Sequence, residues 1–159
     1  MNADGTGQTR LTNNSSDDLA PAWSLDGGRV AFVSRRDGEH QIYVMNADGT
    51  SVLRVTNTGA RDEYPAWSPD GTKIAFTSNR TSRSDIYLMS ADGTNQTRLT
   101  ISTGEDRSTW ASWSPDGTKI AFAAQRAGMW EVHSINADGS GQTRLTEAGS
   151  HNYTPSWGP

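Results

Sequence analysis

The residues with the broadest catalytic chemistry in this sequence are three histidines, and each stands alone. His40, His133 and His151 lie far apart, without H-E-x-x-H or another paired spacing that binds zinc. Among scattered serines and aspartates they define no catalytic triad. The G-x-S-x-G turn, the P-loop and the dinucleotide-binding glycine motif are missing. We therefore expect no enzymatic activity, no cofactor and no bound metal.

Asp-Gly pairs recur along the whole chain and are the pattern closest to a cation site. A calcium loop of the EF-hand type needs D-x-[DN]-x-[DN]-G and a more distant glutamate, which this chain lacks. Asp-Gly also supplies the positive φ of tight hairpin turns. We interpret the pairs as turns, and their aspartates are Asp4, Asp26, Asp48, Asp70, Asp92, Asp116 and Asp138.

Composition excludes several classes of protein. The chain has 159 residues, 33% of them hydrophobic, a mean hydropathy of -0.71 and no apolar run long enough for a membrane helix. It has no cysteine, so disulfides and thiolate metal sites are excluded. A formal net charge of -4 without a basic stripe disfavours nucleic-acid binding. No basic segment followed by an apolar stretch marks a signal peptide.

A repeat of about 44 residues runs through the chain. The segment M-N-A-D-G-T or a close variant begins at Met1, Met45, Met89 and Ile135. The motif W-S-x-D-G and the dipeptide Ala-Phe recur once in each repeat. Their aromatic residues are Trp23, Trp67, Trp113, Trp157, Phe32, Phe76 and Phe122, of which Trp157 only begins the motif.

One period is typical of four short strands. In the second repeat we expect strands around Trp67, at Lys73–Ser78, at 85–89 and at 96–100. Ile74 and Phe76 alternate with Ala75 and Thr77, which is the period of a strand and not of a helix. No segment favours a helix longer than one turn.

A four-stranded unit of this size cannot bury both sheet faces alone, whereas stacking such units in a ring buries the faces and protects the edges. The sequence therefore predicts an all-β fold, a β-propeller of four-stranded antiparallel blades. We expect the repeated tryptophans and phenylalanines to pack between blades. The alternative is that the tryptophans bind an aromatic ligand.

The repeats resemble the TolB-type propeller repeat, a relative of WD-type blades. In the second repeat the match is carried by 67–71, 74–76, 86–87 and 91–93, and the same pattern fits the repeats around Trp23 and Trp113. Leu25 replaces the proline of W-S-P-D-G in the first repeat. His133 and Ser134 replace a tyrosine and an aliphatic residue in the third.

The resemblance implies one of two roles. TolB of the bacterial cell envelope binds partner proteins, and related propellers are non-catalytic gating domains of prolyl-oligopeptidase-like and tricorn-like peptidases. A periplasmic or other extracytoplasmic location is implied as well. TolB-like rings have six blades and a separate N-terminal α/β domain, and this chain has neither.

We expect one domain over 1–159 that begins and ends within a blade. Complete blades are predicted at about 20–57, 64–100 and 109–146, with lone strands at 7–12 and 153–158. Open sheet faces promote association, so we expect a homodimer that closes a six-bladed ring. In that ring each lone strand competes with a strand of the partner for the same position in a blade. One of the two competing strands must be displaced, swapped or added at an edge, unless the ring has eight blade positions.

The two rims of such a propeller differ. The Asp-Gly turns share one rim, and varied polar loops share the other, where recognition of a protein or peptide is expected. The loops before the innermost strands carry acidic residues that favour a basic peptide or a cation at the channel mouth, unless they are ordinary surface charge. These residues are Asp18, Asp62, Glu63, Glu105 and Asp106.

Two tryptophans stand outside the repeating pattern. Trp110 and Trp130 are either anchors for a partner or packing residues beside the channel. The sequence thus predicts a non-enzymatic, self-assembling propeller that binds protein or peptide. The alternatives are a gating propeller separated from a peptidase, and a truncated or constructed array without a ligand.

Overall fold

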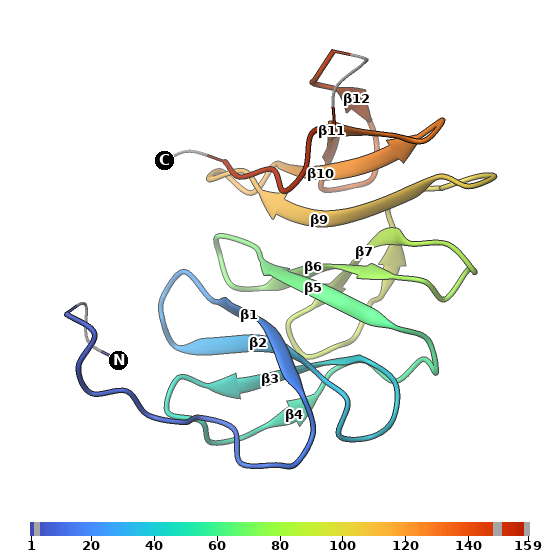
Figure 1. Ribbon diagram of the computed structural model, residues 1–159. Helices are drawn as coiled ribbons and strands as arrows, with labels where there is room; N and C mark the ends of the chain where they lie inside the picture. Colours follow the sequence, from blue (N-terminus) through green and yellow to red (C-terminus); the bar gives the residue numbers. More distant parts are fainter. Residues whose placement is uncertain (2–3, 148–150, 158–159) are drawn as a thin grey trace.

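The computed structural model describes residues 1, 4–147 and 151–157, and no residue in these ranges is helical. The strands form three four-stranded antiparallel sheets in which sequence neighbours pair, stacked one above another in Figure 1. This confirms the all-β class and the four-stranded blades. No helix in the described part of the chain is long and apolar enough to cross a membrane.

Each blade has three longer strands and a two-residue outer strand. The first blade contains β1 (Asp18–Trp23), β2 (Arg29–Ser34), β3 (Gln41–Asn46) and β4 (Leu53–Arg54). The second contains β5 (Asp62–Trp67), β6 (Lys73–Ser78), β7 (Asp85–Ser90) and β8 (Thr97–Arg98). The third contains β9 (Arg107–Trp113), β10 (Lys119–Arg126), β11 (Met129–Asn136) and β12 (Thr143–Arg144).

The predicted boundaries need correction at both ends of a blade. The inner strands begin two residues before the expected 20, 64 and 109, because each continues pairing beyond a bulge. The outer strand of the second blade is shorter than the expected 96–100. There the Thr100 hydroxyl, and not a backbone carbonyl, accepts the Ile86 N–H at 2.9 Å, which ends the ladder.

The expected lone strands at 7–12 and 153–158 are a further correction. No described residue of either segment is in a strand, because a strand requires a paired neighbour and no described strand pairs with them; residues 158 and 159 lie outside the described residues. Leu11 nevertheless packs on the apolar cluster of the first blade. The Asn152 N–H donates to the Trp130 carbonyl at 3.0 Å, as the Asp62 N–H does to the His40 carbonyl at 2.9 Å.

The core lies between blades. β1 contacts β5, and β5 contacts β9, so these strands form the inner wall of the stack (Figure 1). Each blade turns a face with Trp and Phe, its leading face, toward the smaller side chains of the preceding blade's trailing face. At the first interface the cluster consists of Ala31, Ile42, Val44 and Val55 against Trp67, Ile74, Phe76, Tyr87 and Met89.

The repeated tryptophans also fasten each blade to the one before it. In three of them the indole N–H donates to the carbonyl of the residue that precedes the tryptophan of the previous repeat. The pairs are Trp67 to Ala22 (3.1 Å), Trp113 to Ala66 (3.1 Å) and Trp157 to Ser112 (3.0 Å). Trp23 has no such acceptor among the described residues and is 56% exposed, whereas Trp67 is 8% exposed.

The Asp-Gly pairs form turns, as expected. Gly93 has a φ of 88°, and a Cβ there would lie 2.4 Å from the Val55 carbonyl oxygen of the preceding blade. The hydroxyl of Ser114 donates to Asp116, which helps to lower the pKa of this carboxyl to about 2. Among the described residues, no group of three or more His, Asp or Glu side chains is placed to hold a metal ion.

The third blade differs from the second at several buried positions, and one of them is His133. His133 stacks on Phe122 with ring centroids 5.8 Å apart, as Tyr87 does with Phe76 at 5.8 Å. Burial lowers the pKa of the His133 imidazole, and the hydrogen bond with Glu131 offsets this only in part. The lowered pKa favours the neutral form of this buried imidazole.

Trp67→Phe is predicted to weaken the first interface. It removes the indole N–H and leaves the Ala22 carbonyl without its donor, at a cost of about 2 kcal/mol. Trp23→Phe is the matched control and should change the free energy of unfolding by less than about 0.5 kcal/mol. Urea unfolding of the monomeric fraction measures both. Equal losses would contradict the role of the indole hydrogen bond.

His133→Tyr is predicted to reduce the loss of stability that the folded protein undergoes as the pH falls. A histidine whose folded pKa is lowered stabilises the fold above the unfolded pKa of about 6.5, and this contribution is lost as pH falls through the folded pKa. The Tm of the variant should exceed that of the parent by more at pH 5 than at pH 8. His151→Tyr, at an exposed position, serves as control, and parallel pH profiles of parent and H133Y would exclude this role.

Candidate functional site

The inner strand of every blade carries a bulge at one fixed repeat position. Ala20, Tyr64 and Trp110 adopt positive φ values of 47°, 53° and 55°, and Thr154 follows with 47°. This conformation costs an ordinary residue roughly 1–2 kcal/mol. Its recurrence with four different side chains means that the backbone geometry belongs to the repeat. The side chain at this position is the part that varies.

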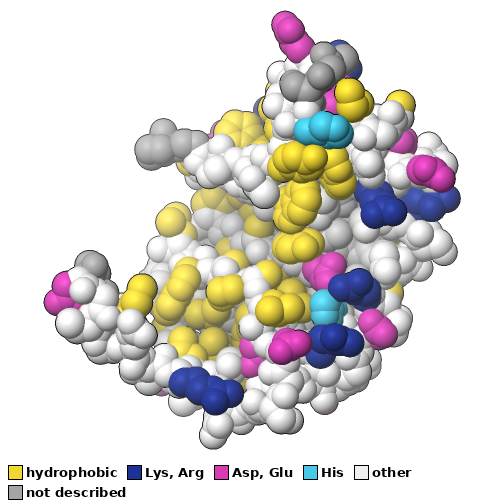
Figure 2. All heavy atoms as spheres, viewed as in Figure 1, with side chains coloured by type: hydrophobic (Ala, Val, Ile, Leu, Met, Phe, Trp, Pro, Cys, Tyr) yellow, Lys and Arg dark blue, Asp and Glu magenta, His cyan; other side chains and the backbone are white. Residues whose placement is uncertain are grey.

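Four aromatic side chains meet at the bulges of the second and third blades, and we call them the aromatic column: Tyr64, Trp110, Trp130 and Tyr153. Ring centroids are 5.8 Å apart for Tyr64–Trp110, 5.4 Å for Trp110–Trp130 and 5.8 Å for Trp130–Tyr153. His151 stacks on Tyr153 at 5.9 Å. Figure 2 shows a column of hydrophobic side chains on the visible face, with a histidine at its upper end.

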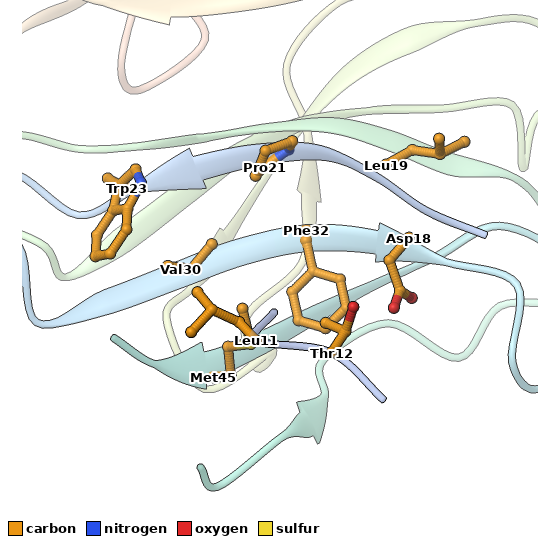
Figure 3. Close-up of a pocket in the computed structure, with 9 residues that line it drawn as sticks. All are labelled: Leu11, Thr12, Asp18, Leu19, Pro21, Trp23, Val30, Phe32 and Met45. Carbon is orange, nitrogen blue, oxygen red and sulfur yellow. The ribbon is translucent and has the colours of Figure 1, made fainter. Parts of the chain in front are cut away.

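A cavity of about 300 Å³ opens elsewhere, on the leading face of the first blade (Figure 3). Its apolar lining includes Val30 and Phe32, whose counterparts in the second blade, Ile74 and Phe76, pack against the preceding blade. Leu19 is 47% exposed at its edge. In the described structure no blade packs on this face, and none packs on the trailing face of the third blade at the other end of the stack.

The aromatic column borders a smaller cavity of about 190 Å³. Its described lining is Glu63, Tyr64, Thr77, Ser84, Arg107, Thr109, Trp110 and Trp130. Within the described part of the chain, the indole nitrogens of Trp110 and Trp130 donate to no acceptor, and the Tyr64 hydroxyl has no partner. The column therefore combines apolar faces with unused hydrogen-bond donors.

Two of the predicted acidic residues are engaged in the fold. Asp62 is fully buried, and its carboxylate lies 3.2 Å from Arg80 Nη2. Asp18 is mostly buried and lies 3.1 Å from Arg36 Nη2. Burial raises the pKa of Asp18, but hydrogen bonds outweigh it and lower the pKa overall; the donors are Ser34, Thr12, Asn14 and Arg36. Asp62 has no surface to offer a ligand.

The two arginines also cover aromatic rings. The guanidinium of Arg36 lies 4.7 Å from the centre of the Tyr43 ring, and that of Arg80 lies 4.3 Å from the centre of the Tyr87 ring. Burial and the hydrogen bond to Asp37 raise the pKa of Tyr43 to about 12. These arginine contacts connect the varied loops to the inner strands.

The other predicted acidic residues lie nearer the surface. Glu63 contacts His40 Nδ1 and lies 2.7 Å from Arg61 Nη2. Asp106 lies 3.8 Å from Arg126 Nε. Glu105 is exposed and lines a polar cleft of about 330 Å³ together with Arg83, Arg107, Gln125 and Gly128. The structure thus distributes the five acids among local ion pairs and this cleft.

The sequence identified half of the aromatic column. Trp110 and Trp130 are brought into contact, whereas Tyr64 and Tyr153 were not predicted as site residues, and His151 was interpreted only as an isolated histidine. Tyr64 occupies the repeat position of Trp110, so aligning the repeats residue by residue would have paired them. The contact with Tyr153 depends on how the segment 151–157 docks.

Stacked antiparallel four-stranded blades with contacting inner strands define a β-propeller. The chain belongs to the TolB beta propeller domain family, whose model matches residues 1–65 and 61–159.

Solved structures agree with this assignment. TolB from Acinetobacter baumannii is 26% identical with a TM-score of 0.83, and the match covers 97% of this chain and 38% of that one. A protein described as a TolB of Agrobacterium tumefaciens is 28% identical with a TM-score of 0.74, covering 91% of this chain and 56% of that one. This chain therefore spans about half or less of these relatives.

A curated relative matches a shorter stretch. Dipeptidyl-peptidase 5 of Porphyromonas gingivalis is 43% identical over 42 residues, which is 26% of this chain and 6% of the relative. The matched length is about that of one blade.

Proposed function

We propose that this chain is a non-enzymatic propeller module that binds protein or peptide at the rim of varied loops, through the aromatic column. The observation that carries the proposal is a set of four contacting aromatic rings beside a cavity, with unused indole donors. Tyrosine and tryptophan with one apolar and one polar part are enriched in protein interfaces. The family assignment supports an extracytoplasmic location as part of this proposal.

We further propose that a second copy covers the leading face shown in Figure 3 and closes a ring. The internal interfaces are the template, because a face with Trp and Phe packs on small side chains of the preceding blade. The third blade carries such small residues, Ala121 and Ser134, at the corresponding positions of its trailing face. The first blade of one copy thus complements the third blade of another.

Closure requires one rearrangement. The segment 151–157 already uses the Trp130 and Ser112 carbonyls that the partner's β1 would need. We propose that the partner's β1 displaces this segment, which withdraws Tyr153 from the aromatic column and leaves the contacting rings of Tyr64, Trp110 and Trp130 in place. The segment has no strand pairing, whereas β1 is paired with β2 in its own blade, and this makes the segment the weaker competitor.

The second candidate function is a gating propeller of a peptidase. The 42-residue match to dipeptidyl-peptidase 5 favours it. In that case the ligand at the rim is a peptide on its way to a catalytic domain elsewhere. Both candidates place recognition at the same surface.

Panning of a random dodecapeptide phage library on the immobilised protein is predicted to enrich specific peptides. Trp110→Ala should reduce their binding about tenfold, because truncating a central aromatic anchor typically costs more than 1 kcal/mol. Ala20 has the same backbone conformation in the first blade, so the variant has a precedent for folding. Leu25→Ala, an exposed apolar residue on the opposite rim, is the control. No enrichment, or equal binding by W110A, would overturn the function.

Light scattering across a concentration series is predicted to find a dimer near twice 17.2 kDa. Leu19→Asp with Trp23→Asp should abolish it, since both side chains lie on the open face. Trp157→Ala should tighten it about tenfold by weakening the competing segment, a change of about 1.4 kcal/mol.

Ile101→Asp, at a residue 75% exposed outside this face, is the control and should leave the mass unchanged. A folded monomer at all concentrations would contradict the ring. A weaker dimer for W157A would contradict displacement.

A further inference from the structure

We propose that the aromatic column binds a proline-rich segment in the polyproline II conformation. This inference rests on the proposed function and names its ligand class. It follows from the shape of the column and from the kind of hydrogen-bonding groups that the column leaves free.

The rings form ridges and not a flat platform. The planes of Tyr64 and Trp110 meet at 62°, and those of Trp110 and Trp130 meet at 39°. Tilted neighbouring rings leave V-shaped clefts between them. A pyrrolidine ring is compact and apolar and fills such a cleft, and aromatic-lined grooves are the usual docking surface for polyproline II segments.

The bulges give the ridges a fixed spacing. Tyr64 and Trp110 occupy the same position in adjacent blades, and the strained backbone holds both side chains on the inner wall. Because the two residues come from packed neighbouring strands, binding requires little ordering of the site. A polyproline II ligand is stiff as well, so both partners lose little conformational entropy.

Three free polar groups of the site can donate hydrogen bonds and cannot accept them. The Trp110 and Trp130 indoles are free, and Arg107 is exposed with no ion pair within the described part of the chain. A polyproline II segment has no internal hydrogen bonds, so its carbonyls are free acceptors, and proline contributes no N–H of its own. A surface rich in donors therefore matches a ligand that offers acceptors.

The three groups that can only donate favour a polyproline II segment over a carbohydrate, the other ligand class that stacks on tryptophan. Sugar hydroxyls need acceptors as well as donors. The one carboxylate in the described lining of the cavity is Glu63; its Oε1 is held by His40 and Arg61, and its Oε2 stays available as an acceptor. The hydroxyls of Thr77 and Thr109 bond to each other at 3.1 Å.

The test is a titration of the protein with acetylated, amidated decaproline, followed by tryptophan fluorescence. We expect saturable binding, at least tenfold weaker affinity in Trp110→Ala, and a smaller loss in Tyr64→Phe, which keeps the ring and removes the hydroxyl. Leu25→Ala should bind like the parent. A Gly-Ser decapeptide, flexible and without pyrrolidine rings, should bind at least tenfold more weakly than decaproline.

Three outcomes overturn the inference: no saturation with decaproline, equal affinity for the Gly-Ser peptide, or binding that W110A leaves unchanged. Saturable binding of maltotriose or chitotriose at the column, without decaproline binding, would assign a sugar site. The phage-library experiment distinguishes failure of the polyproline ligand from failure of peptide binding in general. Enriched peptides without proline that need Trp110 would preserve peptide binding and reject the polyproline ligand, whereas an unproductive library would reject peptide binding itself.

Discussion

The packing of one blade on the next is the interaction on which the rest of this structure depends. A single four-stranded blade exposes two apolar faces, and here each interface buries a leading face of Trp and Phe against smaller side chains. The indole hydrogen bond adds direction to this apolar contact, because it joins the inner strands at one fixed point in every repeat. Packing sets the distance between blades, and the hydrogen bond sets their register.

The same interaction explains the ends of the described structure. The segment 151–157 has no strand partner, yet Trp157 forms the indole bond of its repeat and Asn152 forms the backbone bond. Docking on the preceding blade is therefore separable from pairing within a blade. At the other end, Trp23 has the same side chain and no acceptor among the described residues. The leading face of the first blade is therefore one half of an interface whose other half is not present in the described part of the chain.

The sequence predicted the repeat and its strands well because both follow from local patterns. The alternation of Ile74 and Phe76 with Ala75 and Thr77 placed β6 at Lys73–Ser78, where the structure has it. The surroundings of a side chain, in contrast, depend on residues that are distant in the sequence. Asp62 was expected at the channel mouth, but Arg80, 18 residues away, pairs with it inside the protein. The bulge at Tyr64 escaped notice because nothing in its residue types indicates a positive φ.

The bulge also suggests how a repeat with constant architecture acquires a specific surface. Its geometry appears in each blade with Ala20, Tyr64 and Trp110, so the strained conformation is maintained by the surrounding ladder and not by the side chain it carries. The side chain is then free to change without loss of the fold. Two large aromatic residues in adjacent blades, joined by Trp130, turn this permissive position into a continuous surface. Because the inner strands are held in register by the indole bonds, the spacing of that surface is set by the same interaction that holds the blades together.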